Sequence, residues 1–174
     1  MHGDVHWRSV AATFLYIHKI KMDINPSVGL AFAIFHDSQR QDEMGDPWHG
    51  EAAAEFVASS DALLHLLGPV RRDHVFTACA LHNEGYVERS NPSIGACLDA
   101  DRLNLVRIGI QPKMDYMSVI KTESEMKQVL SYVEDIWRNP PEWDWLFAQN
   151  SSIASWELAS EDCVEKVEIT PRTC

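Results

Sequence analysis

Histidine and aspartate side chains occur in this sequence where apolar helical faces would otherwise continue. The central instance is His36-Asp37, which ends an apolar run from Val28 to Phe35. Such a run predicts a buried helix, and burying a polar group without a partner costs free energy. Two adjacent side chains of the metal-ligand type at its end therefore indicate the centre of a metal site.

Further ligand-type side chains lie on inward helical faces or at helix ends. The expected ligands are His6, His36, Asp37, His49, His82 and Asp101. Imidazole and carboxylate without thiolate suit iron, manganese, zinc, cobalt or magnesium better than a structural thiolate zinc site. Six ligands exceed the needs of one tetrahedral ion, and the Asp37 carboxylate could bridge two. We therefore predict two divalent ions as cofactors.

The helical period separates two nearby aspartates. In the helix expected after Asn91-Pro92, Asp101 shares a face with Leu98, whereas Asp99 shares another face with Arg102. The pattern assigns Asp101 to the metal. It gives Asp99 a capping role or a role in supporting the ligands.

Two arginines are candidates for contact with an anionic substrate. Arg40 lies three positions after Asp37, at the expected mouth of the site. A guanidinium can hold a phosphate through two hydrogen bonds, so Asp37 and Arg40 are the predicted catalytic residues. The alternative for Arg40 is an ion pair with an acidic residue of its own loop. Arg102 is expected either to pair with Asp99 or to bind the substrate.

The elements that must position these residues are all helical. Periodicity and capping signals predict helices over 4–21, 28–35, 46–68, 73–83, from 91 onward and from 122, followed by an aromatic packing segment at 143–156. We expect an all-α bundle with the metal site between the helices. The whole chain, 1–174, reads as one domain, with a core over about 2–110 and a C-terminal helical extension over about 111–174. The tryptophans at 143, 145 and 156 are expected to pack inside, or alternatively to form a lid or homodimer surface.

Composition excludes several classes of function. The formal net charge of −11 argues against a nucleic-acid polymer or an anionic membrane as the partner, but a metal centre still permits an anionic small molecule. No apolar stretch reaches the roughly 20 residues of a membrane span. The four cysteines have neither zinc-like nor redox-like spacing, so a reduced, cytoplasmic protein is expected.

The motifs resemble those of the HD superfamily of metal-dependent phosphohydrolases. The likeness covers about residues 2–110 and rests on His6-Trp7-Arg8-Ser9-Val10, His36-Asp37 and Ala100-Asp101-Arg102-Leu103. His49-Gly50-Glu51 and Leu81-His82-Asn83 resemble the extra histidine motifs of dinuclear members, including bacterial hydrolases of diadenosine tetraphosphate. The resemblance implies one metal held by His6, His36, Asp37 and Asp101. It implies a second held by His49 and His82, with Asp37 as the bridge.

The expected function is hydrolysis of a phosphoester or phosphoanhydride, in a nucleotide or related small molecule, by metal-activated water. Asn83 stands where the diadenosine tetraphosphate hydrolases have threonine, so their substrate is not carried over. Two alternatives stay open. One is a di-iron oxygenase of the same superfamily, which uses a similar ligand set. The other is a non-enzymatic ligand-binding or regulatory protein that contains the metal.

Overall fold

Two asparagine-proline pairs begin the helices that carry the central part of the fold. The Asn25 side chain accepts a hydrogen bond from the Ser27 amide, and Pro26 takes the first position of helix α2 (Pro26–Phe35). Asn91 caps helix α5 (Pro92–Leu103) in the same way, with Pro92 at its start. A capping side chain satisfies an amide that lacks a helical partner, and proline has no amide to leave unsatisfied.

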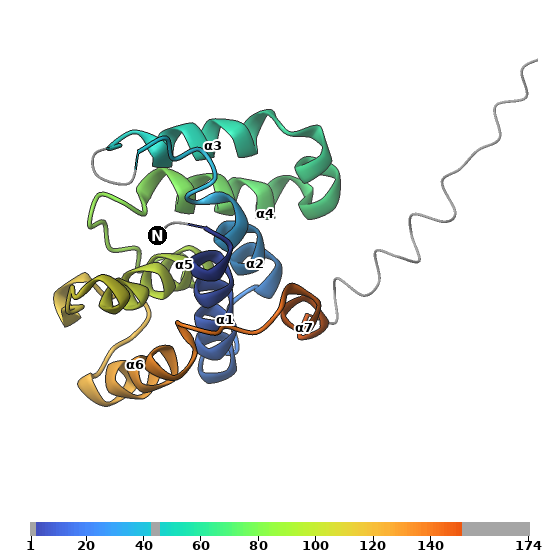
Figure 1. Ribbon diagram of the computed structural model, residues 1–174. Helices are drawn as coiled ribbons and strands as arrows, with labels where there is room; N and C mark the ends of the chain where they lie inside the picture. The colour runs from blue at the N-terminus through green and yellow to red at the C-terminus, as the bar shows by residue number, and fades with distance from the viewer. Residues whose placement is uncertain (1–2, 43–45, 151–174) are drawn as a thin grey trace, which may run out of the picture.

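The computed structural model describes residues 3–42 and 46–150. These residues form helices and the loops that connect them, and no strand occurs among them. The expected all-α fold is confirmed (Figure 1). The further elements are α1 (Asp4–Ile20), α3 (His49–Ser59), α4 (Asp61–Leu81), two short 3₁₀ helices, η1 (Asn104–Ile108) and η2 (Met114–Tyr116), α6 (Glu123–Ile136) and α7 (Trp143–Ala148). No helix in this described part combines the length and hydropathy needed to cross a bilayer.

Helix α2 lies at the centre of the bundle, where it contacts α1, α4 and α5 (Figure 1). Residues 27–33 are buried on every face, as the apolar run predicts. Gly29 lets α1 approach closely, because a Cβ there would lie 2.1 Å from the Phe14 ring. This packing fixes the direction of α2, and therefore the place where His36 and Asp37 leave it.

The expected helix over 46–68 is wrong in its limits. Asp46 accepts a hydrogen bond from the Trp48 amide, but helix α3 begins only at His49 and ends at Ser59. Ser60 then caps α4 by accepting from the Leu63 amide. At Gly68 the backbone leaves the helical conformation, with a φ of 73° and a ψ of 166°, so α4 consists of two helical stretches that meet at a kink where the sequence predicts a helix end. A serine cap therefore ends the third helix earlier than the Gly68-Pro69 signal suggested.

The C-terminal extension packs against α1. Thr122 caps α6 by accepting from the Glu125 amide, as the sequence predicts. The Trp143 indole donates to Asp4, 2.7 Å away, and Leu146 of α7 is fully buried. Trp145 is 45% exposed, so the aromatic segment is only partly internal. Trp156 and the rest of the expected extension lie outside the described residues.

Candidate metal centre

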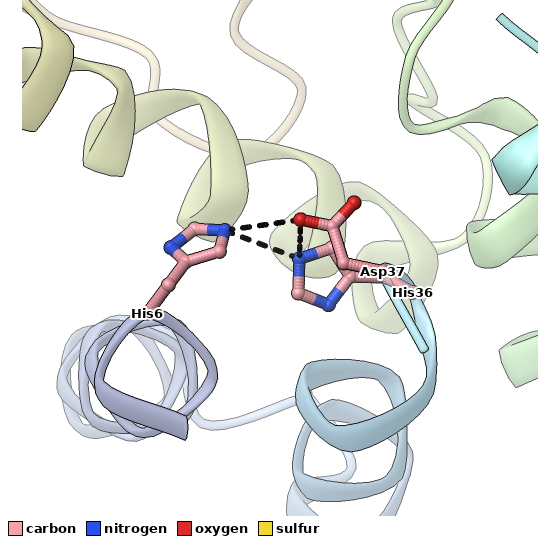
Figure 2. Close-up of side chains that lie close together, drawn as sticks. All are labelled: His6, His36 and Asp37. Carbon is pink, nitrogen blue, oxygen red and sulfur yellow. Dashed lines mark hydrogen bonds and ion pairs between the residues drawn. The ribbon is translucent and has the colours of Figure 1, made fainter. Parts of the chain in front are cut away.

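The first group of ligand atoms gathers where the start of α1 meets the end of α2. His6 Nε2 lies 3.3 Å from His36 Nε2 and 3.6 Å from Asp37 Oδ2, and these side chains point toward one another (Figure 2). Asp101 on α5 adds an oxygen, 3.4 Å from His6 Nε2. Four side chains from three helices thus bring two imidazole nitrogens and two carboxylate oxygens into one small volume.

The second group uses the other oxygen of Asp37. His49, the first residue of α3, places Nε2 3.2 Å from Asp37 Oδ1. His82, directly after α4, places Nε2 3.6 Å from the same oxygen and 3.0 Å from His49 Nε2. All six sequence-predicted ligands are therefore close together, in two groups that share one carboxylate. His6, His36 and Asp37 could hold one ion, and Asp37, His49 and His82 another.

Backbone carbonyls fix the orientation of three of the imidazoles. His36 Nδ1 lies 3.1 Å from the Ala33 carbonyl, His49 Nδ1 2.5 Å from that of Asp46, and His82 Nδ1 2.7 Å from that of Cys79. An Nδ1–H donated to a carbonyl leaves Nε2 with a lone pair directed into the site. This arrangement is typical of metal-ligating histidines, because it sets both the tautomer and the direction of the ring.

The donor set fits a cation. In the second group the Nε2 lone pairs of His49 and His82 face each other and the oxygen of Asp37. These acceptors repel one another at 3.0–3.6 Å unless a positive charge lies between them. Two carboxylates and four imidazoles, with no thiolate, are the ligands expected for a non-structural zinc, iron, manganese or cobalt site.

Burial prepares these groups for ligation. Burial lowers the pKa of His36 to about 4, so its imidazole is neutral near pH 7. Burial raises the pKa of Asp37, but the close contacts with His49 and His82 outweigh this effect and hold the pKa below its usual value. The pKa of Asp101 is lowered in the same manner, with contact to His6 outweighing burial. The metal-binding form of each of these three side chains therefore predominates at neutral pH.

A close approach of α3 and α4 brings His49 and His82 together. A Cβ on Gly50 would lie 2.8 Å from the Cys79 carbonyl, the group that orients His82. A larger residue at position 50 would separate the two helices by pushing against backbone. The Gly50 that follows His49 is therefore part of the reason that the second group can form.

Arg40 contacts the second group directly. Its Nη1 lies 3.3 Å from Asp37 Oδ1 and 3.1 Å from His49 Nε2, while its Nε donates to the Asp42 carbonyl. The predicted position at the mouth of the site is thus observed. A cation bound between Asp37 and His49 would compete with the guanidinium for the same lone pairs. This competition would release Arg40 Nη1 for another acceptor.

Asp99 and Arg102 serve the backbone around the site. The Asp99 carboxylate is fully buried and accepts hydrogen bonds from the amides of Ser118, Val119 and Ile120. Arg102 donates to the carbonyls of Tyr86 and Tyr116, and not to Asp99. Arg102 also lines the cavity at the site, so its contact with substrate stays a prediction. The helical period separates the two aspartates correctly, although Asp99 is the more buried of them.

A cavity of about 510 Å³ opens at the ligand groups. Its lining includes four cationic side chains, which are Arg40, Arg102, Arg107 and Lys113, and two carboxylates, Asp37 and Asp101. Sequence reasoning missed Arg107 and Lys113, because both lie in a segment without helical period or motif. The only signal was their position just after the last ligand. The wall of the cavity is cationic although the whole chain carries −11.

The chain matches no protein-family model, no curated protein and no solved structure. The fold and the two ligand groups are therefore the features that bear on the function of this chain.

Proposed function

We propose that this chain is a metal-dependent phosphohydrolase of the HD type, which cleaves a phosphoester or phosphoanhydride bond of a small molecule. The single observation that carries the proposal is the position of Asp37, whose two oxygens face two different histidine pairs beside a cationic cavity. A shared carboxylate suits two ions held close together, and such pairs commonly act on phosphoryl groups. The order and helical placement of the ligand residues agree with the HD resemblance.

His6, His36, Asp37 and Asp101 would hold one ion, and Asp37, His49 and His82 the other. Bound divalent ions would polarise phosphoryl oxygens and acidify a water molecule at neutral pH. The carbonyl contacts at Nδ1 keep the His36, His49 and His82 rings fixed during this chemistry. Fixed ligands need little reorganisation as charge develops on the substrate.

Arg40 supplies the first contact for the substrate anion. Its side chain is only partly exposed and already lies within hydrogen-bond distance of the ligand residues. A planar guanidinium at this place can bind two phosphoryl oxygens and stabilise negative charge there. No nucleophilic side chain is required, because the attacking group is water.

The cationic wall favours hydrolysis over the oxygenase alternative with a neutral polyol. Four cationic side chains around two carboxylates produce a positive field even before any metal binds. An anionic substrate neutralises that field, whereas a neutral polyol leaves the surplus of positive side chains uncompensated beside the bound metal ions. The non-enzymatic alternative, a ligand-binding or regulatory protein, would use a cavity at the ligand groups as well, so phosphate release is the property that separates it from a hydrolase.

The test is a panel of phosphoesters and phosphoanhydrides, assayed for phosphate release with Mn²⁺, Fe²⁺, Co²⁺ and Mg²⁺. We expect metal-dependent release by the wild-type chain and its loss in His36→Ala. The matched control is His65→Ala, since His65 lies on α4 away from the ligand groups. Oxygen consumption with a polyol or phosphonate, without hydrolysis of any phosphate compound, would instead establish the oxygenase alternative.

A further inference from the structure

Half of the residues that line the cavity come from one continuous segment. The ligands themselves come from several helices, but the facing wall runs from Leu105 through η1 and η2 to Met117. This segment, residues 105–117, follows the last ligand, Asp101, and carries no metal-binding side chain. We name it the recognition wall.

We propose that the recognition wall selects the substrate and that Arg107 is its anion-binding residue. This inference rests on the proposed phosphohydrolase function and deepens it. The substrate class that follows is an organic phosphate whose organic part is apolar or aromatic.

Arg107 is held on a firm support. Its Nη1 donates to the Asn104 carbonyl, 3.0 Å away. Asn104 is fully buried, and its amide nitrogen donates to Thr13 of α1 and to the Ala100 carbonyl of α5. The guanidinium of Arg107 is therefore anchored through Asn104 to the junction of α1 and α5. These two helices also carry His6 and Asp101, so the guanidinium keeps a fixed relation to the first ligand group.

Arg107 and Arg40 line the same cavity and neighbour different ligand residues. Arg107 and His6 together line the ligand-bearing cavity and a second cavity beside Trp137 and Arg138. Arg40, in contrast, contacts His49 of the second group. Arg107 thus shares its surroundings with His6 of the first group, and Arg40 with His49 of the second. An anion in the cavity between them could receive hydrogen bonds from both arginines.

Electrostatics place Arg107 within the field of the ligand carboxylates. Burial lowers the pKa of Arg107, while the charges of Asp101 and Asp37 raise it. A partly desolvated cation binds an anion more strongly than one fully in water, because the local dielectric is lower. Arg107 is therefore better suited to hold a phosphate than an exposed arginine of the same chain.

Beside Arg107, three large side chains of the recognition wall are apolar and open to water. Ile108, Ile110 and Tyr116 all line the cavity, yet they are 41%, 49% and 48% exposed. Large apolar side chains that remain open to water at a cavity can gain free energy when a ligand covers them. Such a surface contacts the organic part of an ester, and inorganic phosphate leaves it uncovered.

The experiment is calorimetric titration of the full, manganese-loaded chain with inorganic phosphate and with phenylphosphonate. Arg107→Gln should weaken the binding of both probes about tenfold or more, which is the loss of about one charged hydrogen bond. Arg107→Lys should restore part of the affinity. Tyr116→Ala should weaken phenylphosphonate binding and leave the affinity for inorganic phosphate unchanged.

The matched control is Arg138→Gln, because Arg138 lines only the second cavity. It should bind both probes as the wild type does, and every variant should keep its manganese. Normal phosphate affinity in Arg107→Gln, or loss of its manganese, would overturn the inference about Arg107. Phosphoester hydrolysis by the wild type would show that the proposed function still holds in that case. Failure of the manganese-loaded wild type to bind phosphate would contradict the proposed function itself.

Discussion

Asp37 and His49 meet through Oδ1 and Nε2 at 3.2 Å, while the other oxygen of the same carboxylate faces His6 and His36. One side chain at the end of α2 therefore joins two groups of ligands that come from opposite sides of the bundle. No other described carboxylate belongs to both candidate ion groups. This relationship makes Asp37 the residue on which a dinuclear site depends.

The two aspartates on α5 should have separable functions. Asp101→Ala should lose one metal ion and retain most of its stability. Asp99→Ala should keep the metal ligands but leave three buried amides, those of residues 118–120, without their acceptor. Each such amide costs about 1–3 kcal/mol, so the free energy of unfolding should fall by roughly 3 kcal/mol or more.

Metal analysis and urea unfolding of both purified variants, each compared with the wild type, check this pair of predictions. Equal loss of stability in the two variants, with equal metal content, would show that the helical period does not divide their roles. The two variants act as each other's controls, because they lie two positions apart on one helix.

His82→Ala should lower the metal content to about one ion per chain without unfolding the bundle. His82 lies at the end of α4, and its removal leaves His49 and Asp37 as an incomplete second group. Metal content and the thermal unfolding of the variant check this prediction. A matched control is His74→Ala, whose imidazole contacts Asn91 and not the ligand groups. If His82→Ala still bound two ions tightly, His82 would be a buried core residue and not a metal ligand.

Arg40→Ala should raise the KM for an anionic substrate about 10- to 100-fold, because it removes a charge-assisted contact worth roughly 1.5–3 kcal/mol. Its metal content should be unchanged, since Arg40 donates to the ligands and does not replace them. Steady-state kinetics and metal analysis check both statements. Normal kinetics in Arg40→Ala would show that Arg40 does not bind the substrate and that its role is the hydrogen bond with the Asp42 carbonyl.

The sequence predicts the buried, ligand-bearing part of the molecule better than its cavity wall. Continuous burial of α2 and the caps at Asn25 and Asn91 are local signals, so they were readable. The positions of His49 and His82 followed from helix ends. In contrast, the sequence prediction ended the third helix at Gly68-Pro69 and overlooked the cap at Ser60. In the structure α3 ends at Ser59, Ser60 caps α4, and Gly68 forms a kink within α4.

The role of Arg107 could not be read in advance for a different reason. It lies in a 3₁₀ segment whose position depends on Asn104, and Asn104 is held by Ser9 and Thr13 of α1, which are distant in sequence. Arg102 illustrates the same limit, because its partners are backbone carbonyls of two loops. Motif position identifies side chains that could hold a metal. Tertiary contacts decide which cations are available to a substrate.

The most direct test of the account is the metal content of the purified chain after reconstitution, compared between the wild type and Asp37→Ala. The account predicts two divalent ions per wild-type chain and almost none in Asp37→Ala, because each ligand group loses the oxygen that the two groups share. Asp46→Ala is the control, since that carboxylate accepts hydrogen bonds from the amides of Gln41 and Trp48 among the described residues, and it should keep both ions. Full metal content in Asp37→Ala, or a wild-type chain that binds no ion, would contradict the account.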